Sequence, residues 1–271
     1  GGRPCGSAFK VFTLVTALEK NISPQTYIDC SSPATIDKYT VQNYDNINYG
    51  TRTIARALAV SSNTGFVRLI SSIGVDDVAK TAKQMGISSD LNAKSAGATL
   101  TLGVENVTPL EMAEAFATIA NGGIHCDATP IAKIEDRNGK TLVDNTDVSK
   151  RSERVLSEEV AYAAEQVMEG VVNSSEGTGV EARLDNGQVV AGKTGTTENY
   201  KDITFFGITP KLSVGIWCGD PSNAQSVPVG TDCADVFATF ANKVMKASDV
   251  EQWKKPSTQI QYTNYTDEKY H

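Results

Sequence analysis

Residues 3–10 read Arg3-Pro4-Cys5-Gly6-Ser7-Ala8-Phe9-Lys10, and an apolar run follows them to Lys20. Apolar residues recur on both faces of this segment, which predicts a buried helix from Ser7 to Lys20. A serine and a lysine three residues apart lie on one helix face, with Cβ atoms about 5–6 Å apart. A serine is a weak nucleophile until a base accepts its proton, and a lysine kept neutral by burial is such a base. The stretch therefore predicts covalent serine chemistry.

Two further patterns complete a candidate site. Ser61-Ser62-Asn63 separates two predicted helices, 53–59 and 65–73. Lys193-Thr194-Gly195-Thr196 comes directly after a predicted strand, 188–191. A strand edge of lysine, small residues and hydroxyls can pair with an extended peptide and bind its terminal carboxylate. The first two patterns each arise about once by chance in a chain of this length, and Lys-Thr-Gly in only about a few per cent of chains. Their order along the chain is the stronger argument.

The remaining pattern predicts an α+β fold. Residues 21–50 are rich in Ser, Pro, Asn and Asp and predict a loop, and Thr108-Pro109-Leu110-Glu111 has the pattern of a capping box that begins a helix. The other predicted elements are helices 76–84, 109–121, 157–172 and 235–246, a hairpin over 131–143 around Asn138-Gly139, and strands 203–209 and 212–217.

Composition excludes several classes of function. The 271 residues carry a formal net charge of −7, and the basic residues form no run longer than Lys254-Lys255, so we expect no nucleic-acid partner. No segment approaches the roughly 18 apolar residues that span a bilayer, so we expect no membrane contact in this segment. The only histidines are His125 and His271, and there is no CxxC pair, so we expect neither a metal nor a cofactor. The chain begins without methionine or a signal peptide, and we expect a segment of a longer protein.

The five cysteines leave two interpretations open. Scattered cysteines suit an oxidising, extracytoplasmic compartment, but buried free thiols would give the same pattern. An odd number leaves at least one thiol unpaired. Cys218 with Cys233, and Cys30 with Cys126, are candidate disulfides.

The three patterns resemble the motifs of the penicillin-binding, active-site-serine transpeptidases. Flanking residues are similar too, and the stretch 192–197 with Lys201-Asp202 resembles the bifunctional class A members in particular. The similarity runs from residue 3 to about residue 220. The other similar segments are Arg3 to Lys10, Asn43-Tyr44-Asp45 with Tyr49-Gly50, Ala57 to Thr64, and Leu102-Gly103 through Val107 to Ala113 and on to Gly123.

The resemblance implies a role for each motif residue. Ser7 is the acylated nucleophile, Lys10 its base, and Ser61 the relay of a proton to the leaving amine. Asn63 holds the substrate amide, Lys193 contributes positive potential, and Thr194, Gly195 and Thr196 bind the substrate and its terminal carboxylate. The backbone N–H groups of Ser7 and Thr196 form the oxyanion hole.

The resemblance also implies a β-lactamase/transpeptidase-like α+β fold, with an antiparallel sheet flanked by helices and an all-helical subdomain. We expect this domain over residues 1–252 and a polar tail over 253–271. Family domains have a strand pair before the nucleophile helix, whereas this chain begins six residues before Ser7, so we expect those first strands to be absent from it. Thr204 stands where many class A members have tryptophan, and Cys218 replaces an apolar strand residue.

The implied function is a D,D-transpeptidase that cross-links peptidoglycan stem peptides, using a D-Ala-D-Ala donor and an amine acceptor, with β-lactams as covalent inhibitors. The implied location is extracytoplasmic, in a parent protein anchored in the bacterial cytoplasmic membrane. A D,D-carboxypeptidase or serine β-lactamase is an alternative, although no glutamate stands in a recognisable deacylating loop. A non-catalytic sensor of β-lactams or muropeptides is another.

Overall fold

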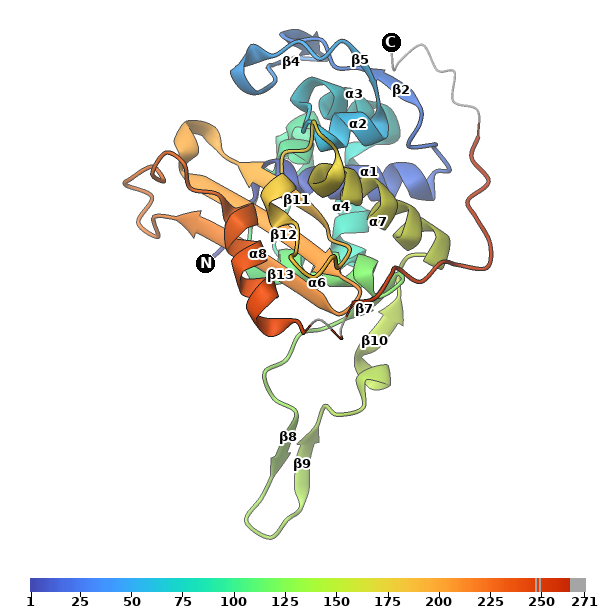
Figure 1. The fold of residues 1–271 in the computed structure, drawn as a ribbon, viewed down its shortest axis with the longest axis vertical. Coiled ribbons are helices and arrows are strands. Elements are labelled where there is room, and N and C mark those ends of the chain that lie inside the picture. The colour runs from blue at the N-terminus through green and yellow to red at the C-terminus, as the bar shows by residue number, and fades with distance from the viewer. Residues whose placement is uncertain (247, 249, 264–271) are drawn as a thin grey trace.

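The largest sheet among the described residues is three-stranded and antiparallel, with the order β11-β12-β13 (Figure 1). The computed structural model describes residues 1–246, 248 and 250–263. The strands are β11 (Ala191–Thr196), β12 (Asp202–Thr209) and β13 (Leu212–Gly219), so the predicted strands 203–209 and 212–217 are confirmed.

The predicted strand 188–191 is wrong except at its last residue. The strand is β11, so Lys193, Thr194, Gly195 and Thr196 form it rather than follow it. Glycine and lysine are poor strand formers, which hid this strand in the sequence. The glycines occur in this strand because neighbouring atoms leave no room for a side chain: a Cβ at Gly192 would lie 2.5 Å from the Phe205 ring.

Two helices cover the two faces of the sheet. Adjacent residues of β12 point to opposite faces, so Phe205 packs against Phe237 of α8 (Cys233–Val244) and Phe206 against Phe116 of α6 (Pro109–Ala120). The ring centroids are 5.2 and 5.6 Å apart. The predicted capping box at the start of α6 is confirmed.

The segment that contains Ser7 forms a short 3-10 helix, η1 (Gly6–Phe9), that continues into α1 (Lys10–Glu19). Every residue of α1 from Lys10 to Leu18 is buried, which confirms the predicted all-round apolar helix. It packs against α7 (Glu158–Asn173), whose predicted cap, Ser157, accepts a hydrogen bond from Val160 N.

A mainly helical subdomain follows α1. Its helices are α2 (Ile54–Ala59), α3 (Asn63–Ile73), α4 (Val75–Gln84), α5 (Ala93–Ala96) and η3 (Gly97–Leu102). The prediction of a loop over 21–50 is incomplete, because strands of three residues are too short to show alternation. That region contains β2 (Tyr27–Asp29), β3 (Ala34–Ile36), β4 (Tyr39–Val41) and η2 (Tyr44–Asn46), and β5 (Thr51–Thr53) pairs with β2.

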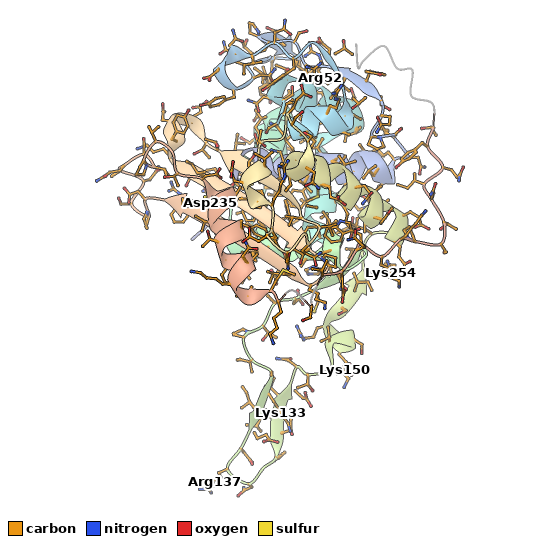
Figure 2. The ribbon with its side chains drawn as sticks, in the orientation of Figure 1. Arg52, Lys133, Arg137, Lys150, Asp235 and Lys254 are labelled. Carbon is orange, nitrogen blue, oxygen red and sulfur yellow. The ribbon has the colours of Figure 1, made fainter. Side chains whose placement is uncertain are left out.

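The remaining segments connect these layers. The predicted hairpin is confirmed as β8 and β9, and it projects from the body with Lys133 and Arg137 far from the sheet (Figure 2). The connecting elements are β1 (Arg3–Pro4), β6 (Asn106–Val107), β7 (Ile124–Cys126), β8 (Lys133–Glu135), β9 (Thr141–Asp144), η4 (Val148–Arg151), β10 (Ser152–Arg154), η5 (Val180–Ala182) and η6 (Glu198–Tyr200).

The described part of the C-terminal segment runs back over the body (Figure 1). Trp253 is buried and donates to Glu169 Oε1 at 2.7 Å, and Thr263 pairs with Ile22. Residues 264–271 of the expected tail lie outside the described residues. Among the helices that the structure describes, none combines the length and apolar character that a bilayer crossing requires.

Candidate active site

The candidate nucleophile, Ser7, and its candidate base, Lys10, lie together at the start of α1. Ser7 is in η1, and Lys10 Nζ lies 2.9 Å from Ser7 Oγ, as the three-residue spacing predicts. The lysine side chain is fully buried. It also donates to Ser61 O and Asn63 Oδ1, each at 2.7 Å, and to Ser61 Oγ at 3.2 Å. The first two motifs therefore meet at one amine.

A second buried lysine reaches the same hydroxyl from the sheet. Lys193 Nζ donates to Ser61 Oγ at 2.9 Å, so two amines flank one serine. Burial, and then the charge of Lys193, hold the pKa of Lys10 well below its usual range. Burial also lowers the pKa of Lys193 to about 7. Both shifts favour a state in which at least one of the two lysine amines is neutral.

Hydrogen bonds from buried residues hold the turn that contains Ser61 in place. Ser61 adopts a left-handed conformation with φ +57°, and Ser62 accepts a hydrogen bond from Gly65 N to cap α3. The buried Asn43 accepts from Asn63 N at 2.8 Å and donates to Cys30 O and Ile47 O, each at 2.9 Å. Asn43 lies in one of the similar segments, but no local pattern in the sequence predicts this positioning role, because Asn63 is 20 residues away.

Strand β11 lies directly against η1, with no space for side chains between the two backbones. A Cβ on Gly195 would lie 2.0 Å from Cys5 O and 2.3 Å from Thr204 Oγ1, and one on Gly6 would lie 2.8 Å from Thr196 N. Thr204 donates to Cys5 O at 3.0 Å. The Thr204 hydroxyl thus anchors the segment before Ser7.

Gly195→Ala is expected to lower the melting temperature, because the methyl group forces β11 away from η1. It should also slow acylation of Ser7 by penicillin, the inhibitor that the sequence resemblance implies, at least about tenfold. Thermal unfolding and time-resolved intact mass measure the two effects. Gly170→Ala is the matched control, since a Cβ there meets nothing within 4 Å and alanine suits a helix interior. Equal acylation rates in both variants would contradict the close-packing argument.

The outer end of β11 is joined to the loop after α7. Thr194 Oγ1 lies 2.7 Å from Thr178 Oγ1, and Thr178 N donates to Ala59 O at 3.2 Å. Thr194 is half-buried and Thr196 is exposed, so both hydroxyls can meet a ligand. Thr178 is a positioning residue that the sequence did not reveal, because its partners are distant along the chain.

A buried carboxylate ties the chain before Ser7 to the chain after Thr196. Asp202 accepts from Arg3 Nε at 2.8 Å, from Trp217 Nε1 at 3.0 Å and from Thr197 Oγ1 at 3.0 Å. It is only 2 % exposed. Asp202 lies in a segment of similar sequence, but the local pattern indicates no role for this aspartate.

The structure thus brings together every residue of the three predicted motifs, around Ser61 or along β11. It also contains a cavity of about 400 Å³ between α2, α7 and residues 256–262, but none of the motif residues lines it. Among the described residues, no group of three or more His, Cys, Asp or Glu side chains is arranged to hold a metal ion.

Comparison with known proteins agrees with this geometry. The family model "Penicillin binding protein transpeptidase domain" matches residues 2–216. The chain is 32% identical to penicillin-binding protein 1A of Clostridium botulinum, over 95% of this chain and 32% of that protein, so it spans about a third of the relative's length. The penicillin-binding protein PonA1 of Mycobacterium tuberculosis has a TM-score of 0.85 and 29% identity, over 97% of this chain and 73% of that one.

The same PonA1 protein in complex with penicillin V has a TM-score of 0.84 and 29% identity, over 97% of this chain and 74% of that chain. These neighbours share the α+β architecture of sheet and helices described above, which confirms the expected fold class. The match covers all three motifs. The chain belongs to the family of penicillin-binding protein transpeptidase domains.

Proposed function

We propose that this domain is a serine D,D-transpeptidase that joins peptidoglycan stem peptides through an acyl-enzyme on Ser7. One observation carries the proposal: a fully buried lysine, Lys10, contacts both the nucleophile Ser7 and the serine Ser61, which a second buried lysine also contacts. This arrangement supplies a nucleophile, a base and a proton relay without histidine.

In acylation, neutral Lys10 accepts the Ser7 proton while Ser7 Oγ attacks the carbonyl carbon of the penultimate D-Ala. The backbone N–H groups of Ser7 and Thr196 stabilise the oxyanion, and the close approach of Gly6 to Thr196 N supports this role. Ser61 gives its proton to the nitrogen of the leaving D-Ala as the C–N bond breaks and takes up the proton that Lys10 received from Ser7, which leaves Lys10 neutral again. An acceptor amine then attacks the ester, forms the cross-link and returns the proton to Ser7.

Substrate contacts come from the two sides of this centre. Asn63 holds the substrate amide, and Gly195 keeps β11 close against η1, so that the peptide can pair with β11 beside Ser7. The terminal carboxylate binds Thr194 and Thr196, with the charge of Lys193 behind them. Loss of a single oxyanion donor typically costs about 3–4 kcal/mol in the transition state, so the position of β11 matters as much as its side chains.

The proposal extends to the parent protein. We assign the transpeptidase domain to residues 1–252 and a polar tail to 253–271, in a membrane-anchored parent that acts on the extracytoplasmic face. The complex of PonA1 with penicillin V supports β-lactams as covalent inhibitors of this domain. Among the described residues, no carboxylate is hydrogen-bonded to Ser7, Lys10 or Ser61, which favours transfer to an amine over hydrolysis by a carboxylate-activated water.

The test incubates the chain with a donor peptide ending in D-Ala-D-Ala and a peptide amine, and follows D-Ala and cross-linked product by mass spectrometry. Cross-linked product with stoichiometric D-Ala is expected. D-Ala with only the shortened peptide would establish a carboxypeptidase instead. If penicillin acylates Ser7 and rapidly leaves as the hydrolysed acid, the domain is a β-lactamase. Ligand binding without any product would establish a sensor.

The rate of acylation by penicillin is expected to depend on pH as a bell. Lys10 must be neutral to act as base, so the rate rises as pH passes upward through its lowered pKa. Lys193 must be charged to attract the carboxylate, so the rate falls as pH rises through its pKa of about 7. The active state therefore holds one proton on the lysine pair.

Stopped-flow acylation with a fluorescent penicillin between pH 5 and 10 measures this profile, with Lys193→Arg as the comparison. An arginine stays charged throughout, so the descending limb should disappear while the ascending limb remains. A descending limb unchanged in Lys193→Arg would assign that titration to another group.

A further inference from the structure

Two cysteine thiols lie in contact at the edge of the sheet, close to the active site. Cys218 is the penultimate residue of β13 and Cys233 is the first residue of α8, and their Sγ atoms are 2.9 Å apart. Cys233 Sγ also lies 3.2 Å from Ile203 O, on the strand next to Cys218. All five cysteines are free thiols in the structure, so neither candidate disulfide is formed in it.

The contact follows from the architecture. Alternate residues of β13 face α8, and Cys218 is on that face with Val214 and Ile216, packed against the cluster that contains Cys233. The two sulfurs are already closer than a van der Waals contact, so a bond between them needs only a small approach rather than a rearrangement of the backbone. No comparable contact joins Cys30, buried beside α3, to Cys126 on β7.

We propose that Cys218 and Cys233 form a disulfide that closes the loop 219–232 and thereby fixes the two chain segments that frame the nucleophile. The oxidant is a disulfide of low molecular mass or of a thiol–disulfide oxidoreductase.

The loop between the two cysteines contacts both of these segments. Asn223 Oδ1 accepts from Arg3 Nη2 at 2.6 Å, four residues before Ser7. On the other side, Val227 N donates to Tyr200 O at 2.7 Å, and Lys201 Nζ donates to Ala224 O at 3.0 Å. Tyr200 and Lys201 follow the carboxylate-binding end of β11. A covalent bond across the base of the loop restricts its conformations and so holds these contacts in place.

The bond forms in two exchanges. The thiolate of Cys218, the more exposed partner, attacks the oxidant disulfide, forms a mixed disulfide and releases one thiolate. The thiolate of Cys233 then attacks Cys218 Sγ, forms the internal S–S bond and releases the second thiolate. The oxidant gains two electrons, and the two thiol protons pass to the released thiolates. Burial and the neighbouring Cys218 raise the pKa of the Cys233 thiol, so the second exchange accelerates as pH rises.

The test equilibrates the full chain with a graded series of oxidised and reduced glutathione, denatures it in an alkylating reagent and maps every cysteine by peptide mass spectrometry. The expected product has Cys5, Cys30 and Cys126 alkylated, and a peptide pair joined through Cys218 and Cys233. Cys218→Ser and Cys233→Ser each lose that pair. Alkylation of both thiols throughout the series, or a bond between other cysteines, would overturn the proposal.

A second measurement tests the effect on the loop, using limited proteolysis of the oxidised chain, the reduced chain and the double variant C218S/C233S. Cleavage within 219–232 is expected to be at least about tenfold slower in the oxidised chain, and the melting temperature higher by several degrees. The double variant should behave as the reduced chain under both redox conditions. Equal cleavage and equal melting temperatures in all three samples would show that the disulfide fixes nothing, which overturns the positioning role.

Discussion

Ser7→Ala is expected to abolish formation of a covalent adduct with penicillin. Ser7 lies at the start of the buried helix α1, with the Lys10 amine 2.9 Å from its hydroxyl. Ser61 also has a lysine amine 2.9 Å from its hydroxyl, so mapping of any adduct distinguishes the two serines. Loss of an activated serine typically slows a covalent enzyme by about 10⁴- to 10⁶-fold. Intact mass over hours, with the adduct mapped by digestion, measures the loss.

The fold of this variant should be retained. The Ser7 hydroxyl has one hydrogen-bond partner, Lys10, and the side chain is half-exposed, so its removal leaves no cavity in the core. Ser71→Ala, on α3 and bonded only to the exposed Asp37, is the matched control and should acylate normally. An adduct on folded Ser7→Ala protein would falsify the assignment of the nucleophile.

Lys10→Met is expected to slow acylation by about 10²- to 10⁴-fold, the usual contribution of a general base. Methionine fills the same buried volume without an amine, so the helix packing persists while Ser7 loses its proton acceptor. The ascending limb of the pH profile should vanish with the amine. Stopped-flow kinetics with a fluorescent penicillin measures both effects.

Two lysine variants separate the base from a merely structural role. Lys20→Met removes an exposed amine at the end of α1 and should leave the rate unchanged. Lys10→Arg keeps a cation near Ser61 but cannot become neutral, so it should be as slow as Lys10→Met. Normal acylation by Lys10→Arg would show that the side chain positions Ser61 by its charge instead of accepting a proton.

The helices and the motif residues were predictable because their signals are local. The periodicity of apolar residues indicated α1, and the N-cap residues Thr108 and Ser157 indicated where α6 and α7 begin. The spacing of Ser7 and Lys10 already placed a hydroxyl beside an amine. These patterns depend on residues within one or two turns of each other, which a sequence displays directly.

What the sequence concealed depends on contacts between distant segments. Asn43 holds Asn63 and Thr178 holds Thr194, yet neither pair has a local pattern. Strand β11 was predicted at the wrong position because its glycines are required by the close packing against η1. Glycine has a low strand propensity, so the sequence showed no strand signal there. The near-contact of Cys218 and Cys233 likewise arises only when α8 packs on the sheet.

The two buried lysines, Lys10 and Lys193, lower the free energy of unfolding of the domain when no ligand is bound. Folding removes two amines from water and places them around one hydroxyl, and no described carboxylate neutralises either. Because both pKa values fall on folding, the unfolded chain binds more protons at neutral pH and is favoured by that difference. In the proposed function, the terminal carboxylate of the substrate binds beside Lys193 and supplies the missing counter-charge. The same uncompensated positive charge therefore lowers the unfolding free energy of the free domain and raises its affinity for an anionic ligand.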